Sequence, residues 1–337
     1  MEKIWHVLEQ YSIRPDTIEQ VTDRVYKIKV GQQVYALKRS NLTEQTVKNL
    51  ENFYHVAYYE RLPLVLPVYL TVAEKLYAEL DNEFYYIAPW IEQEEHHRQQ
   101  DFYTAFFRSI GQFHHKTMQK HTFSVDKIKS SFTSYKIQCQ TDYKKLLSMV
   151  ERFEHHPYMS PFELLVCSQF HYLEYVFKNL ERAVDEFLEC EMDAWRTSLC
   201  HGKLEQEYLF YREYFWVINW EHVRNDNPIS DLHYYLTEQA NRYDIETTSI
   251  FETFHAYMEE NELRREELHL LSIYLLNPQK YIETVLAYVE KGNETDMIGF
   301  IQKLQQAFRN LRFGLEWTDF VKETYIYRID LESKEET

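Results

Sequence analysis

Apolar and polar residues alternate in two stretches within the first 90 residues. The first stretch, 25–38, contains two alternating runs on either side of Gly31, and the second, 76–88, contains two runs on either side of Asp81 and Asn82. Alternation on both sides of turn-forming residues is typical of a β-hairpin. The sequence therefore predicts two hairpins near its beginning.

Other segments repeat their apolar residues every three or four positions, which predicts amphipathic helices. Two such helices are expected at 1–16 and 43–61, and an extended run follows at 64–70. Further helices are predicted at 101–119, 134–153, 161–190, 249–260, 265–275, 278–290 and 295–310.

Two short strands, 208–211 and 215–220, interrupt the helical part of the chain. A small mixed region followed by a large helical region with one small hairpin predicts an α+β fold with two lobes. We expect a β-rich lobe over 1–90 and a helical lobe over 91–337.

Composition excludes several classes of function. The chain has 337 residues and a net charge of −17, which disfavours binding to nucleic acid or to anionic membranes. No apolar run approaches the roughly 20 residues needed to span a bilayer, and the N-terminus has no signal-peptide pattern. The four cysteines form no CxxC pair, so we expect reduced thiols rather than a zinc site or a disulfide framework.

Adjacent histidines occur at 96–97, 114–115 and 155–156. Neighbouring side chains on a helix point about 100° apart and seldom share a metal ion. We therefore expect these to be surface or loop histidines.

Three short segments carry the most specific pattern. They are Leu199-Cys-His-Gly-Lys203, the strand Val217-Ile-Asn-Trp-Glu221, and Asn227-Pro-Ile-Ser-Asp231-Leu232. In this order they resemble the catalytic region of the aminoglycoside phosphotransferase and choline kinase families, which contains H-G-D, then an Asn, then I-D-W-E and D-P-x-x-D-L. Two further segments resemble the A-x-F-H helix and the lysine-bearing strand of these families: Ile110-Gly-Gln-Phe-His114 and Tyr35-Ala-Leu-Lys38. The resemblance implies a bilobal, protein kinase-like fold over nearly the whole chain.

The resemblance also shows that the reactive positions differ from those of the families. Phosphoryl transfer needs a positioned base and oxygen ligands for Mg²⁺. Lys203 matches the base Asp, Tyr208 the metal-binding Asn, and Asn219 the second metal-binding Asp. Lysine, with an ordinary pKa near ~10.4, cannot accept a proton at neutral pH, a phenol is a poor magnesium ligand, and the amide lacks charge. The pocket gains roughly three positive charges relative to an active relative.

Framework positions are kept within the degenerate catalytic loop, 199–232. His201, Pro228 and Asp231 match residues that shape this loop and anchor the helix after it, and Lys38 matches the phosphate-contacting lysine. We therefore expect no catalytic residue, no metal site and no cofactor. ATP bound without magnesium, through Lys38 and Lys203, stays open.

Several alternatives remain for these residues. Lys38 is equally consistent with a structural ion pair to Glu44 or Glu51, and Lys203 with a solvated loop lysine. Glu221 lies beside Asn219 in the sequence and is a candidate residual metal ligand.

Within the superfamily the chain is most similar to the CotS-like spore coat proteins of endospore-forming bacteria. The similarity rests on its length, on Tyr85-Tyr-Ile-Ala-Pro-Trp-Ile91, and on its 28 tyrosines. It implies a protein made in the mother-cell cytoplasm and assembled into the spore coat, with other coat proteins as partners.

The leading hypothesis is a catalytically inactive, kinase-like structural or assembly protein of the endospore coat. One alternative is an active ATP-dependent kinase that phosphorylates the alcohol group of an aminoglycoside-, choline- or homoserine-like molecule, with Glu221 or Asp226 as metal ligand. A second alternative is a metal-independent sensor of nucleotides or anions.

Overall fold

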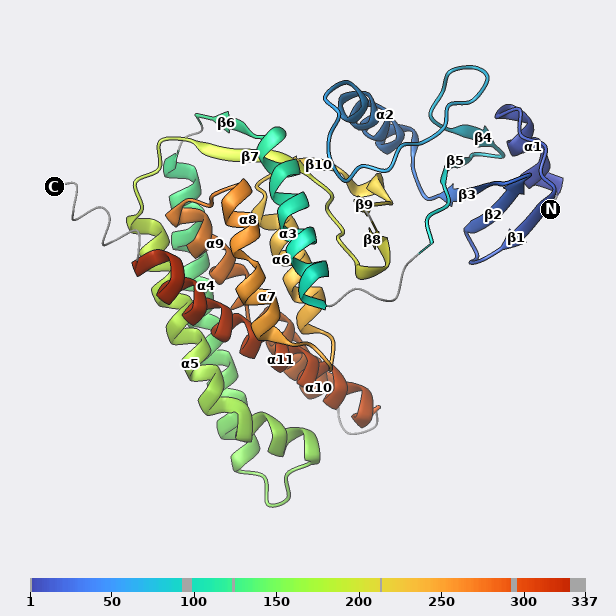
Figure 1. Ribbon diagram of the computed structural model, residues 1–337. Helices are drawn as coiled ribbons and strands as arrows, with labels where there is room; N and C mark the ends of the chain where they lie inside the picture. The colour runs from blue at the N-terminus through green and yellow to red at the C-terminus, as the bar shows by residue number, and fades with distance from the viewer. Residues whose placement is uncertain (1, 93–98, 123–124, 213, 292–295, 328–337) are drawn as a thin grey trace. The chain divides into compact units, whose positions relative to one another are not determined.

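The computed structural model describes residues 2–92, 99–122, 125–212, 214–291 and 296–327 (Figure 1). The chain forms two compact units, each assembled from separate segments. The first unit comprises 1–118, 198–226 and 253–261, and the second comprises 119–197, 227–252 and 262–337. The predicted lobes, 1–90 and 91–337, divide the chain at a single point, whereas these units combine separate segments. The predicted boundary after residue 90 stays a prediction.

An antiparallel sheet forms the beginning of the first unit. Its strands lie in the order β1-β2-β3-β5-β4. Their bounds are β1 (Thr17–Gln20), β2 (Val25–Val30), β3 (Gln33–Ser40), β4 (Ala78–Leu80) and β5 (Glu83–Pro89). Both predicted hairpins, β2–β3 and β4–β5, are confirmed. Strand β1 was not predicted, because this exposed edge strand contains Ile18 as its single apolar residue.

Helix α1 (Glu2–Gln10) packs on this sheet, with Val7 and Leu8 fully buried against residues of β2, β3 and β5. The helix was predicted to continue to residue 16, but it ends earlier. Ser12 adopts a left-handed conformation with φ of 55°, and the amide of Ile13 donates to the carbonyl oxygen of Leu8 over 3.0 Å. This return bond is a Schellman-type helix end.

The predicted helix at 43–61 is confirmed as α2 (Glu44–Tyr59), and it begins with a capping box between Thr43 and Thr46. The capping box satisfies backbone groups that a helix start leaves without partners. The predicted extended segment 64–70 forms only isolated bridges, from Val65 to Val217 and from Tyr69 to Ile87.

The remaining elements of the first unit lie after the sheet in the sequence. They are α3 (Gln99–Lys116), α8 (His255–Glu260), β8 (Leu209–Tyr211), β9 (Phe215–Val217), β10 (Arg224–Asp226), and two short 3-10 helices at Gln206–Tyr208 and Trp220–His222. The predicted hairpin between 208 and 220 is confirmed as β8–β9. Helices α3 and α8 approach closely at Gly111, where a Cβ would lie 3.1 Å from the carbonyl oxygen of Tyr257.

The second unit is mainly helical, and in Figure 1 its two longest helices, α4 and α5, run side by side. Its elements are α4 (Val125–Glu154), α5 (Pro161–Glu189), α6 (Ile229–Ala240), α7 (Thr247–Thr253), α9 (Arg265–Leu275), α10 (Gln279–Lys291), α11 (Met297–Val321) and a π-helical turn at Lys322–Ile326. Helix α6 is absent from the helices predicted by periodicity, although the resemblance implies a helix after the catalytic loop. The predicted helix 249–260 is two helices, α7 and α8.

Strand β7 (Trp195–Cys200) contributes to both units. Its residues 195–197 pair with β6 (Gln119–His121) in the second unit, and its residues 198–200 pair with β10 in the first. This strand leads directly into the loop that carries the family resemblance. All four cysteines are free, as expected.

Candidate functional site

A cavity of about 660 Å³ lies within the first unit. Its walls come from the β1–β2 turn, β3, α2 and the residues just before it, Leu66, β5 and the residues just after it, and the segment 203–222. Apolar side chains form much of this wall, including Val25, Ala36, Leu66, Trp90, Phe210 and Ile218. A cavity of this size and character suits a small organic ligand.

His201 fixes the loop that leads into the cavity wall. The imidazole is fully buried, its Nε2 lies 2.9 Å from the carbonyl oxygen of Ile218, and its Nδ1 lies 3.2 Å from the backbone nitrogen of Lys203. A carbonyl only accepts and a backbone amide only donates. These two contacts therefore require a proton on Nε2 and a lone pair on Nδ1.

The residue after His201 must be glycine. Gly202 has a φ of +80°, and a Cβ at this position would lie 2.5 Å from the carbonyl oxygen of His222 and would overlap the guanidinium of Arg224. The His-Gly pair of the sequence motif is therefore explained by the backbone path.

Lys203, at the position of the family's base, pairs with a carboxylate rather than facing the cavity alone. Its Nζ lies 2.9 Å from Oε1 of Glu205 and 5.9 Å from the ring centre of Tyr208. Burial raises the pKa of the Tyr208 phenol, and its hydrogen bond to Glu205 raises it further. At neutral pH, therefore, this position presents a cation and a protonated phenol.

Lys38 and Glu221 form an ion pair in the cavity wall, with 2.7 Å between Nζ and Oε1. Their side chains are only 20% and 10% exposed. Lys38 also donates to Oδ1 of Asn219, which follows β9 and has a left-handed backbone with φ of 70°. Asn tolerates this conformation better than most residues because its side chain hydrogen-bonds locally.

Two tyrosines complete this polar part of the wall. The hydroxyl of Tyr86 donates to Oε1 of Glu221 over 3.2 Å. Burial raises the pKa of Tyr86 and of Tyr54, and the nearby charge of Glu221 raises both further. Both phenols are therefore protonated and can act as hydrogen-bond donors.

The partner of Lys38 is neither Glu44 nor Glu51, the two candidates offered by the sequence, but Glu221. Burial lowers the pKa of Lys38, Glu221 counteracts this, and the charges of Arg24 and Lys203 lower it further. Lys38 thus lies near two other cations, and Glu221 offsets part of the effect that lowers its pKa. A phosphate contact by Lys38 remains a prediction.

The residues matched to the family's base and metal ligands do not fit a magnesium ion, which prefers a shell of hard oxygen ligands in near-octahedral geometry. Lys203 offers an ammonium group, Tyr208 a protonated phenol, and Asn219 an amide oxygen that already accepts from Lys38. Glu221 supplies a carboxylate, but this group holds Lys38. Asp226, the other carboxylate considered, pairs with Arg224 at 3.0 Å.

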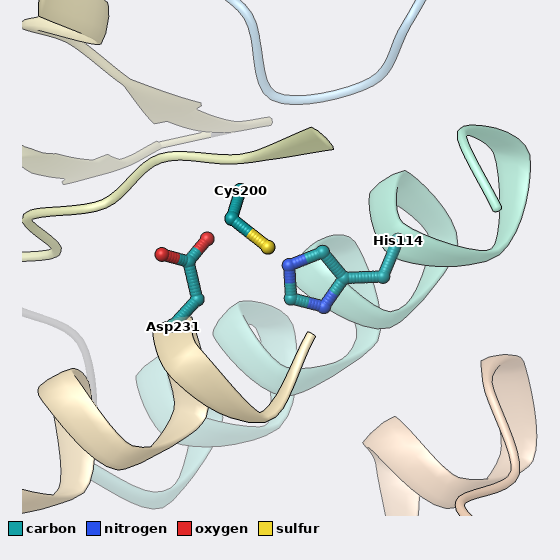
Figure 2. A group of neighbouring side chains, drawn as sticks. All are labelled: His114, Cys200 and Asp231. Carbon is teal, nitrogen blue, oxygen red and sulfur yellow. The ribbon is translucent and has the colours of Figure 1, made fainter. Parts of the chain in front are cut away.

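His114 and Cys200 are fully buried in the first unit, on α3 and at the end of β7 (Figure 2). Nδ1 of His114 lies 2.9 Å from the hydroxyl of Tyr257, and Sγ of Cys200 lies 3.5 Å from the carbonyl oxygen of Asp226. The expectation of a surface histidine is therefore wrong for His114. His96 and His97 lie outside the described residues.

The framework residues of the third motif lie in the second unit. Pro228 precedes α6, and Asp231, also drawn in Figure 2, is fully buried in the first turn of this helix. Oδ1 of Asn227 accepts the amide of Ile229 over 3.0 Å, which caps the helix start.

Arg24, Tyr54 and Tyr86 line the cavity but are not predicted from the sequence. Tyr86 could have been found, because β3 and β5 place it opposite Lys38 once the hairpins are paired. Arg24 lies in the β1–β2 turn, and its place in the wall depends on the unpredicted strand β1.

In the part of the chain that the structure describes, no helix is both long and apolar enough to cross a membrane. The sequence matches no protein-family model, and no curated protein matches it.

Solved structures resemble the chain over nearly its whole length. An aminoglycoside phosphotransferase from Alicyclobacillus acidocaldarius is 15% identical, with a TM-score of 0.72 over 95% of this chain and 96% of that one. Spectinomycin phosphotransferase in an AMP-bound complex is 11% identical, with a TM-score of 0.57 over 93% and 97% of the two chains. Amicoumacin kinase is 14% identical, with a TM-score of 0.54 over 94% and 92%. The chain therefore has the protein kinase-like fold of the aminoglycoside phosphotransferases, with an N-terminal antiparallel sheet followed by a mostly helical part.

Proposed function

We propose that this protein is a catalytically inactive member of the kinase-like fold, whose cavity binds a nucleoside-type ligand without a divalent metal. The observation that carries the proposal is the buried ion pair between Lys38 and Glu221, which also engages Asn219. Glu221 and Asn219, the two groups that could ligate magnesium, both bind the ammonium group of Lys38 instead. Lys203 adds a second cation at the position of the base.

The size and the walls of the cavity support the class of ligand. The cavity of about 660 Å³ has aromatic and aliphatic walls next to a small polar area, which suits a planar base with a sugar. Two structures with the same fold were solved with nucleotides: spectinomycin phosphotransferase with AMP and amicoumacin kinase with AMP-PNP.

The experiment is a thermal-shift panel with AMP and ATP, each measured with Mg²⁺ and with EDTA. We expect at least one of the two nucleotides to raise the unfolding midpoint equally in both conditions, because bound ligand stabilises the folded state. No shift with either nucleotide would overturn the proposed ligand and leave a purely structural role.

A pair of variants tests whether the cavity is the binding site. Trp90→Ala removes an aromatic wall residue, whereas Trp5→Ala removes a half-exposed tryptophan of α1 outside the cavity. The nucleotide-induced shift should disappear in the first variant and persist in the second. Equal shifts in both variants would place the ligand elsewhere.

An active small-molecule kinase is the second candidate. It is favoured by the names of the similar structures, which are phosphotransferases and kinases, and by the carboxylate of Glu221 in the cavity wall. Magnesium-dependent ATP turnover with an alcohol or amine acceptor, abolished by Lys38→Ala, would establish this candidate and overturn inactivity.

The cellular role is proposed from the sequence resemblance to the CotS-like proteins: assembly into the spore coat with other coat proteins. The 28 tyrosines and the degenerate reactive positions support this role. Fractionation of sporulating cells tests it, and recovery of the protein outside the coat fraction would contradict it.

A further inference from the structure

Two adjacent residues of β3 form the same kind of cluster on opposite faces of the sheet. Lys38 pairs with Glu221 at 2.7 Å, and Tyr86, its register partner on β5, donates to the same carboxylate over 3.2 Å. Arg39 pairs with Glu83 at 3.2 Å, and its register partner Tyr85 donates to Glu83 over 2.7 Å.

The two clusters differ in their surroundings. Successive side chains of a strand point to opposite faces, so only the cluster of Lys38 faces the cavity, and Arg39 and Glu83 are absent from its wall. The side chains of Arg39 and Glu83 are 37% and 35% exposed, whereas Glu221 is 10% exposed. Solvent screens the outer pair, and it screens the charge of Glu221 much less.

The carboxylate of Glu221 lies where an anionic group of a ligand would contact Lys38. A ligand phosphate approaching Lys38 would therefore meet a buried negative charge at the same ammonium group. Repulsion between like charges is strong at short range where water is largely excluded.

The positive charge of Lys203, the other lysine of the wall, is also balanced by a carboxylate, because its Nζ lies 2.9 Å from Oε1 of Glu205. Arg24 differs from both: among the described residues, no carboxylate pairs with its guanidinium. The wall therefore offers one arginine to an incoming anion, which matches a single phosphate monoester and not a chain of phosphates.

We infer that Glu221 is a built-in counter-ion of Lys38 that determines ligand specificity: the cavity accepts nucleosides and nucleoside monophosphates and rejects nucleoside triphosphates. This inference rests on the proposed metal-free binding of a nucleoside-type ligand. Glu221 acts on the charge of the ligand and not on the shape of its base.

The experiment is isothermal titration in EDTA with adenosine, AMP and ATP as probes. The wild-type protein should bind AMP at least about tenfold more tightly than ATP. Glu221→Gln keeps an oxygen that can accept from Lys38 and Tyr86 but removes the charge. This variant should bind ATP at least about tenfold more tightly than the wild-type protein does, with adenosine affinity unchanged.

Glu83→Gln is the matched control, because it makes the same replacement in the cluster on the other face. Its affinities for all three probes should equal those of the wild-type protein. Circular dichroism and the unfolding midpoint verify that both variants are folded. The wild-type series tests the inference even if Glu221→Gln does not fold.

The outcomes separate the inference from the proposed function. If the wild-type protein binds ATP as tightly as AMP, or if Glu221→Gln improves adenosine and ATP binding alike, the inference is overturned while metal-free ligand binding stands. If no probe binds the wild-type protein, the proposed ligand is wrong and the inference falls with it.

Discussion

The imidazole of His201 donates from Nε2 to the carbonyl oxygen of Ile218, over 2.9 Å. Its other nitrogen accepts the amide of Lys203, so one buried ring joins the loop after β7 to the residue after β9. This connection involves only backbone partners. It therefore does not directly involve the side chains at positions 203 and 219.

Replacement of His201 should destabilise the protein. His201→Ala removes a partner from the Ile218 carbonyl and from the Lys203 amide, and we expect the free energy of unfolding to fall by about 2–4 kcal/mol. Urea denaturation measures this loss. His6→Ala, at an exposed position of α1, serves as the control and should change stability by less than about 0.5 kcal/mol. An equal effect of the two replacements would contradict the structural role of His201.

Two glycines with positive φ should respond differently to alanine. Gly202 has φ of +80° and no room for a Cβ, whereas Gly31 has φ of +58° and nothing within 4 Å of an added Cβ. Gly31→Ala should cost about 1 kcal/mol from backbone strain alone. Gly202→Ala should cost at least about 2 kcal/mol more, because overlap with backbone forces the chain to shift. Similar losses in denaturation experiments would show that the loop adapts to the extra atom.

Removing only one partner of the Lys38–Glu221 pair should be more harmful than neutralising both. Lys38→Met leaves the carboxylate of Glu221 buried without its cation, and we expect a loss of about 3–5 kcal/mol. The double replacement Lys38→Met with Glu221→Gln carries no buried charge and should recover most of that loss. Thermal and chemical unfolding of both variants test this. A double variant as unstable as the single one would show that packing, and not charge, dominates.

Stability should depend on His233 in acidic solution. Burial lowers the pKa of His233 to about 4 from an ordinary value of 6.5, and the charge of Lys280 contributes to this shift. The unfolded chain therefore binds a proton that the folded protein does not between these pH values. Neutral His233 therefore contributes to the free energy of unfolding. This contribution is fully present above pH 6.5 and is lost as the pH falls towards 4, by about 3 kcal/mol in total.

His233→Gln should remove this contribution, so its stability should fall less steeply than that of the wild-type protein between pH 6.5 and 4.5. Urea denaturation at several pH values measures both slopes. Parallel slopes would mean that His233 is not the source of the acid sensitivity.

Local pattern predicted part of the cavity wall, namely the strands of the two hairpins, but not strand β1, which leads into the turn that carries Arg24. The two hairpins follow from alternation. The family role of His201 in this loop stays a prediction, although the structure does show its hydrogen bond to the carbonyl oxygen of Ile218. The ion partner of Lys38 could not be predicted, because Glu221 lies far along the chain and periodicity carries no information on which side chains meet. The end of α1 was missed for a related reason: a non-glycine residue, Ser12, adopts the left-handed conformation that terminates it.

The left-handed backbone at Asn219 bears on how this cavity can be re-engineered. Aspartate is isosteric with asparagine and tolerates the same conformation, so a carboxylate could be introduced there without moving the main chain. Lys203 and Tyr208 are larger than Asp and Asn, so replacing them by those residues would also enlarge the cavity that they line. If the protein is inactive as proposed, a designer who introduces a metal site would change charge alone at position 219, but both charge and side-chain volume at positions 203 and 208.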